Sequence, residues 1–223
     1  AMIDAIADSG TPIVAVVMAG RPLVMRKLLE RADAVLYAWH PGCMAGPALV
    51  DLLTGDAVPS GRLPVTFPRM TGQIPIYCAH KNTGRPATPE THIHIDEIEQ
   101  GAFQTSLGNT SFHFDAGYTP EFPLGFGLSY TRFEYTSLRL SSEQVQRGEI
   151  LSVSAELTNT GSVTAEEVVQ LYIRDLVGSV TRPVKELAGF QRVSLKPGET
   201  RTVTFMLSAD DLTFYDRNLR RVV

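Results

Sequence analysis

The residues from about Thr131 onward alternate between apolar and polar side chains, and this two-residue period most constrains the fold. In ILSVSAEL (150–157) every second residue from Leu151 is apolar, and those between are polar or charged. The stretches VVQLYIR and TVTFML repeat the pattern between turns such as NTGS and KPGE. The pattern predicts an antiparallel β-sandwich of immunoglobulin or fibronectin type III kind over residues 131–223.

Residues 1–72 follow a different pattern, because helical segments separate short apolar strands there. The predicted order is helix, strand, helix, strand, helix, over residues 2–10, 12–18, 23–31, 33–39 and 45–53. Short β-branched strands spaced by helices form a parallel sheet that is covered on both faces. The predicted fold class is therefore a multidomain one, with a mainly parallel α/β portion followed by an all-β sandwich.

The stretch WHPGCMAG (39–46) leads from the second predicted strand into the last predicted helix. In parallel sheets ligands bind beyond the carboxyl ends of the strands, which is the position of this stretch. It lacks the Lys and the Ser or Thr of a P-loop, and its glycines do not fit the dinucleotide fingerprint. Nucleotide binding is therefore not expected.

Residues 73–130 form a long connection that contains five prolines, as is typical of a functional loop, a binding arm or a linker. Within it, THIHIDEIEQ (91–100) alternates, so we expect a strand or β-arm within residues 90–116. On such a strand His92, His94 and Asp96 would share one face. We weigh a zinc site completed by a third ligand, a solvated or packed strand, and a contact at a substrate rim or second subunit. We favour no metal.

Composition excludes several classes of function. The net charge is −4 and the 20 Lys and Arg residues are scattered, so no nucleic-acid partner is expected. The longest apolar run, Ile13 to Ala19, has seven residues, whereas a membrane span needs about 20. The first ten residues lack the features of a signal peptide. Cys43 and Cys78 fit no metal or redox motif, and either a bridge or two free thiols is compatible with their spacing.

Four stretches together are more specific than any of these patterns. They are GDAVPSGRLPVTFPR (55–69), NTGRP (82–86), FPLGFGLSYTRFEY (122–135) and VTRPVKELAGFQRVSLKPGETRTVTF (180–205). In this order and spacing they resemble the C-terminal half of a glycoside hydrolase family 3 β-glucosidase. The resemblance implies three domains: a (β/α)8 barrel, an α/β sandwich and a fibronectin type III-like domain. Residues 1–72 then correspond to the later part of the second domain, and residues 131–223 to the third without its last strand.

The resemblance also implies an activity. Family members of this kind are retaining, exo-acting enzymes that release terminal β-linked glucose from oligosaccharides or glucosides, and relatives cleave xylosides and other β-linked sugars. Retention requires two carboxyl groups about 5–5.5 Å apart. The family's nucleophile lies on the barrel and its acid/base glutamate aligns before Ala1. We therefore assign no catalytic residue and no cofactor here, and expect the chain alone to be inactive.

Substrate-binding candidates follow from the same resemblance. Trp39 and His40 would face the sugar pocket of the barrel, with domain packing as the alternative. Asn82 and Arg85 of NTGRP would touch substrate or order their loop. The charges of RPVKEL (182–187) are interpreted as a solvated strand face or a domain-contact ion pair.

The family also bears on partners, location and the alternative function. The expected partners are a sugar substrate, the N-terminal barrel and a second subunit contacted through residues 90–116. A secreted or periplasmic location is expected. The alternative function is a non-catalytic module for carbohydrate association or subunit contact.

Overall fold

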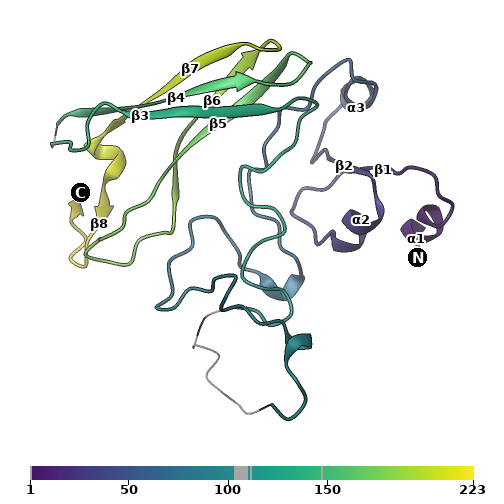
Figure 1. Ribbon diagram of the computed structural model, residues 1–223, viewed down its shortest axis with the longest axis horizontal. Helices are drawn as coiled ribbons and strands as arrows, with labels where there is room; N and C mark the ends of the chain where they lie inside the picture. Colours follow the sequence, from purple (N-terminus) through teal and green to yellow (C-terminus); the bar gives the residue numbers. More distant parts are fainter. Residues whose placement is uncertain (1, 103–109, 111, 147) are drawn as a thin grey trace. The chain divides into compact units, whose positions relative to one another are not determined.

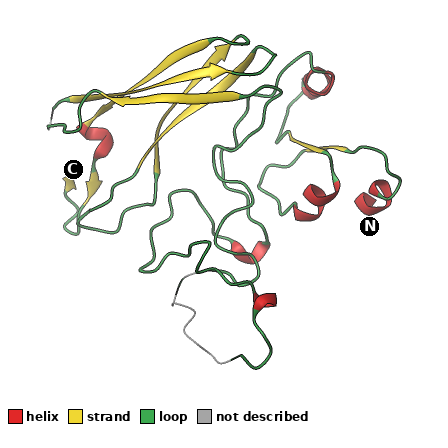
Figure 2. Cartoon of the chain, in the orientation of Figure 1, coloured by secondary structure: helices red, strands yellow, loops and turns green. Residues whose placement is uncertain are grey.

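The computed structural model describes residues 2–102, 110, 112–146 and 148–223. The chain divides into two compact units. The first contains Ala1–Val50, Leu63–Cys78 and Asn82–Leu124, and the second contains Asp51–Arg62, Ala79–Lys81 and Gly125–Val223. Each unit is described by itself below (Figures 1 and 2).

The N-terminal residues alternate helix and strand in the predicted order. The elements are α1 (Met2–Ala7), β1 (Val14–Val17), α2 (Arg26–Arg31), β2 (Ala34–Tyr37) and α3 (Ala45–Thr54). Strands β1 and β2 pair in parallel, with Val14 opposite Ala34 and Val17 opposite Tyr37. None of the helices among the described residues has the length and apolar character needed to cross a bilayer.

The long connection after residue 72 packs back onto the segment before it. Phe67 and Phe122 form an antiparallel bridge, and Phe67 is 1% exposed. The buried Gln73 side chain donates to the carbonyl of Thr119 (3.0 Å) and accepts from the backbone N–H of Arg69 (2.8 Å). A buried amide bonded on both sides fixes the two segments against each other.

The second unit contains a β-sandwich. One sheet has the antiparallel order β3 (Phe133–Leu140), β4 (Ile150–Asn159), β7 (Thr200–Ser208), and the other pairs β5 (Ala165–Ile173) with β6 (Glu186–Leu195). A small hairpin of β8 (Phe214–Tyr215) and β9 (Arg221–Val222) follows. Figure 1 shows the long strands in teal to yellow, with the C-terminus beside β8.

The core of the sandwich lies on the face that the alternation predicts. Val153 and Leu157 of β4 are 6% and 0% exposed. Leu157 packs with the buried side chains Val169, Val193, Leu195 and Val203. Burying one such side chain stabilises a fold by about 1.5–3 kcal/mol, which explains why the two-residue period specifies this sheet.

Candidate functional site

Trp39 lies at the carboxyl end of β2, in an aromatic cluster. Its ring meets that of Tyr37 edge-on at 4.8 Å and that of Phe67 at 5.8 Å. Burial raises the pKa of Tyr37, whose hydroxyl donates to the carbonyl of Arg21. The backbone of Trp39 has φ of 54°, an unusual conformation for a bulky residue that marks functional sites. The ring of Trp39 therefore packs against aromatic side chains of its own unit. Its unusual backbone conformation is the reason to retain Trp39 as a candidate for substrate contact.

His40 lies where the two parallel strands end together. A Cβ atom added at Gly20, which follows β1, would come within 2.1 Å of Nε2 of His40. Only glycine allows this approach. His40 is otherwise exposed, as are Cys43 and Met44 of the following turn. His40 is thus a polar residue that faces solvent beyond the ends of the strands, the position that the sequence predicts for this stretch. Cys43 and Cys78 are both free thiols.

Asn82 and Arg85 lie in an exposed, irregular turn. Neither residue belongs to a strand or helix. The structure thus places these two candidates on a loop, whereas Trp39 and His40 occupy the end of a strand. Both pairs remain candidates for substrate contact.

The strand predicted for residues 91–100 is wrong. Ile95–Glu97 forms a single 3₁₀ turn instead, and His94 caps it. Nδ1 of His94 accepts the backbone N–H of Asp96 at 3.2 Å, and the Glu97 carboxylate accepts the backbone N–H of His94 at 3.1 Å. This reciprocal capping satisfies the backbone locally. The rest of the β-arm expected over 90–116 includes residues 103–109 and 111, which lie outside the described residues.

The three residues weighed as metal ligands do not share one face. His94 and Asp96 are adjacent, with Nδ1 3.3 Å from Oδ2. The ring of His92 instead packs against Phe112 at 5.1 Å and Tyr118 at 5.7 Å. Across the part of the chain that the structure describes, no three His, Cys, Asp or Glu side chains are arranged to hold a metal ion.

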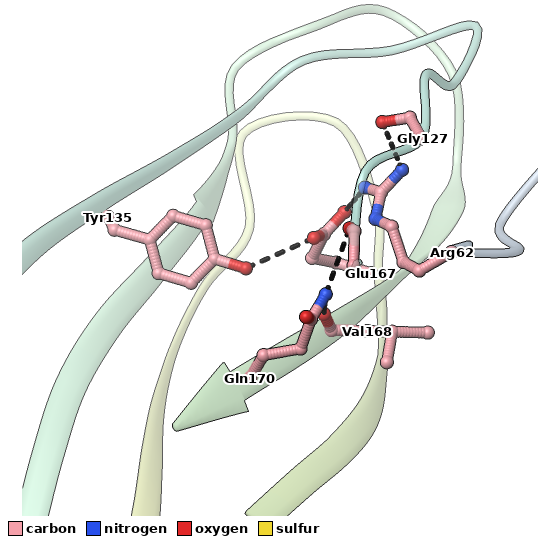
Figure 3. A network of polar contacts seen from close by, with 7 residues as sticks. Arg62, Gly127, Tyr135, Glu167, Val168 and Gln170 are labelled. Carbon is pink, nitrogen blue, oxygen red and sulfur yellow. Dashed lines mark hydrogen bonds and ion pairs between the residues drawn. The ribbon is translucent and has the colours of Figure 1, made fainter. Parts of the chain in front are cut away.

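A buried polar network in the second unit was not predicted from the sequence (Figure 3). The side chains of Arg62 and Glu167 are 13% and 7% exposed and form an ion pair. Arg62 also donates to the carbonyl of Gly127, and the hydroxyl of Tyr135 donates to Oε1 of Glu167 at 3.1 Å. Gln170 on the same strand donates to the carbonyl of Gly125 at 3.1 Å. The network attaches residues 62 and 125–127 to β5.

The role of this network is structural, because its contacts hold residues 62 and 125–127 against β5. Burial and the neighbouring Glu167 carboxylate raise the pKa of Tyr135, so its hydroxyl stays protonated and donates. A Cβ atom at Gly127 would lie 2.5 Å from the carbonyl oxygen of Gly61, so the two segments touch only because position 127 is glycine. The pairing of residues 62 and 167 has no local signal in the sequence.

Arg182 differs from the solvated strand face considered for RPVKEL. Its side chain is 17% exposed, and it forms ion pairs with Glu186 at 2.7 Å and with Asp175 at 3.3 Å. Its guanidinium carbon lies 4.5 Å from the centre of the Phe214 ring, within the range of a cation–π interaction. Asp175 and Glu186 belong to the same unit as Arg182, so these ion pairs lie within the sandwich unit and are not the domain-contact pair considered as the alternative.

Family models match both parts of the chain. The glycosyl hydrolase family 3 C-terminal domain matches residues 1–130, and a fibronectin type III-like domain matches residues 167–223. The chain belongs to glycosyl hydrolase family 3. These two matches confirm the resemblance and the predicted fold class.

Individual family 3 proteins align over almost all of the chain. A periplasmic β-glucosidase of Salmonella typhimurium is 42% identical over 219 residues, covering 98% of this chain and 27% of that protein. A β-xylosidase of Formosa agariphila is 38% identical over 222 residues, covering 100% of this chain and 28% of that protein.

Solved structures agree with these relatives. The β-glucosidase from Listeria innocua, crystallised with glucose, matches with a TM-score of 0.87 and 38% identity, over 99% of this chain and 29% of that chain. The chain thus spans less than a third of the length of each of these three relatives.

Proposed function

We propose that residues 1–223 form the C-terminal portion of a retaining, exo-acting β-glucosidase that releases terminal β-linked glucose from oligosaccharides or glucosides. The observation that carries this proposal is the likeness over the whole chain to β-glucosidases, one of them crystallised with glucose. In this proposal residues 1–72 belong to an α/β sandwich domain, 73–130 to a connection and 131–223 to a fibronectin type III-like domain.

The relatives differ in the sugar that their names give, because a β-xylosidase is also 38% identical to this chain. The test is to assay the complete protein on nitrophenyl β-glucoside and nitrophenyl β-xyloside under the same conditions. We expect a higher kcat/KM for the glucoside. A higher value for the xyloside would replace glucose with xylose and leave the family unchanged.

The proposal places both catalytic carboxylates outside residues 1–223. The reason is the family pattern, in which the nucleophile lies on a barrel and the acid/base glutamate aligns before Ala1. The 223-residue chain by itself should therefore not turn over an aryl β-glucoside, even at high enzyme concentration. Measurable turnover that survives purification to homogeneity would overturn this assignment.

Trp39, His40, Asn82 and Arg85 are proposed to lie at the rim of the substrate cleft. The exposed His40 at the strand ends is the most direct test. His40→Ala in the complete protein should raise KM with a smaller change in kcat, because a rim contact contributes to ground-state binding. His113→Ala, at another exposed histidine of the same unit, is the control and should leave KM unchanged.

The segment 90–116 is proposed to contact a second subunit. Its described part exposes Ile95, Ile98 and Phe114, which are 53%, 39% and 41% accessible. Apolar side chains gathered in one exposed segment are typical of protein contacts. Replacing Ile95 and Phe114 with lysine should lower the solution mass if the contact forms.

A periplasmic or secreted location is proposed from the periplasmic relative.

A further inference from the structure

Gly20 and His40 lie close together just beyond the ends of β1 and β2, within one compact unit. The two strands pair in parallel with Val17 opposite Tyr37, and the backbone N–H of Ala38 continues the ladder by donating to the carbonyl of Val17 at 2.8 Å. Gly20 follows Val17 by three residues, and His40 follows Tyr37 by three residues. The register of the parallel pair therefore brings the two positions together.

The imidazole ring of His40 occupies the space that a side chain at position 20 would need. A Cβ atom there would lie 2.1 Å from Nε2 of the ring and 3.0 Å from both Cδ2 and Cε1. The backbone of Gly20 does not have a left-handed φ, so alanine would carry no left-handed strain at this position. The ring of His40, and not the backbone conformation, is therefore what requires glycine here.

The backbone around this contact is fixed, which leaves the ring of His40 as the part that can move. The hydroxyl of Tyr37 donates to the carbonyl of Arg21 at 2.5 Å, and so ties the residue after Gly20 to β2. The side chain of His40 is exposed and makes no hydrogen bond with any residue that the structure describes. A larger residue at position 20 would therefore turn the ring away, at the small cost in stability that is usual for a surface substitution.

We propose that Gly20 is a positioning residue, which lets the imidazole of His40 take the orientation in which it binds the substrate sugar. A neutral imidazole has one donor and one acceptor nitrogen, and sugar hydroxyl groups both donate and accept. Among the described residues nothing competes for the ring nitrogens of His40. The inference rests on the proposed place of His40 at the rim of the substrate cleft, and it adds the residue that sets where the ring points.

The test is a double-mutant cycle in the complete protein, with kcat and KM measured on whichever nitrophenyl glycoside it cleaves faster. Gly20→Ala should raise KM about 2- to 10-fold, by the same factor as His40→Ala and with a smaller change in kcat. The double variant should be no worse than His40→Ala alone, because both substitutions remove the same contact. Gly72→Ala is the control and should leave KM unchanged, since a Cβ atom at this glycine of the same unit meets nothing within 4 Å.

A second measurement follows the ring itself by NMR of the complete protein with labelled histidine, in which His40→Ala identifies the signals of that ring. Gly20→Ala should shift these signals, and Gly72→Ala should leave them in place. Unchanged signals, additive effects in the double variant, or a raised KM in His40→Ala without one in Gly20→Ala would each overturn the positioning role and leave the proposed function standing. An unchanged KM in His40→Ala would instead refute the rim contact on which the inference rests.

Discussion

Residues 150–157 and residues 91–98 both contain alternating apolar and polar side chains, from Leu151 to Leu157 and from His92 to Asp96, but adopt different backbones. The first segment is the centre of β4, paired with β3 on one side and β7 on the other. The second contains a capped 3₁₀ turn, and none of it belongs to a strand of the described structure. Alternation therefore permits a strand, and neighbouring strands decide whether one forms.

The difference has a simple physical cause. A strand leaves half of its backbone groups unpaired on each side, so it is stable only where other strands supply partners. For β4 these partners are the backbone groups of β3 and β7. Within residues 91–98 the backbone N–H groups of His94 and Asp96 are bonded locally, to the side chains of Glu97 and His94, and that of Ile95 donates to the carbonyl of Phe114 at 2.9 Å. Hydrogen bonds between a side chain and a nearby backbone group need no neighbouring strand, so they form where no sheet is present.

The largest effect is expected from breaking the buried pair that anchors residue 62 on the sandwich. Arg62→Met leaves the Glu167 carboxylate buried without its cation, which should lower the free energy of unfolding by about 3–5 kcal/mol. Urea denaturation followed by circular dichroism measures the loss. Arg192→Met is the matched control, because Arg192 pairs with Glu166 while 60% exposed, and should cost less than about 1 kcal/mol. Equal losses would show that burial of the pair is unimportant.

The next effect compares the two alternating segments directly. Leu157→Ala in β4 removes a fully buried side chain and should cost about 2–5 kcal/mol of unfolding free energy. Ile95→Ala, in the segment without a sheet, removes a side chain that is 53% exposed and should cost less than about 1 kcal/mol. Similar costs would mean that residues 91–98 pack more tightly than their exposure indicates.

A smaller effect should appear at high pH in the sandwich. The folded pKa of Tyr135 is raised above its ordinary value of 10.0, so the folded state holds this proton after the unfolded state has released it. Stability from this group is therefore present below pH 10.0 and falls as pH rises above it. Unfolding curves from pH 9 to 11 measure this, and Tyr135→Phe should flatten the dependence. An unchanged dependence in the variant would assign it to other groups.

The smallest effect is expected at the capped turn. His94→Ala removes the acceptor for the backbone N–H of Asp96, which should cost less than about 1 kcal/mol and act only locally. Hydrogen exchange at the amide of Asp96 should speed up while amides of β4 stay unchanged. His113→Ala should not alter exchange at Asp96; if it does so equally, the capping bond is not the cause.

Much of the fold could be predicted because it depends on local pattern. The helix and strand order of residues 1–54 and the buried face of β4 follow from periodicity. Gly10, whose φ is 75°, is a local stop signal, and α1 ends three residues before it, at Ala7. The location of Trp39 and His40 at the strand ends follows from the topology of parallel sheets. The strand at 91–100 was mispredicted because periodicity carries no information about pairing.

The sequence by itself determined where apolar faces and turns lie, and its motifs determined the family. Tertiary structure alone decided which charged groups meet. Arg62 and Glu167 are separated by 105 positions, and only the folding of residues 51–62 with the sandwich brings them together. Tertiary structure likewise brings the guanidinium of Arg182 over the ring of Phe214 from the hairpin, at 4.5 Å. Charged side chains have no periodic signal of their own, so their partners are fixed only when the apolar faces have packed.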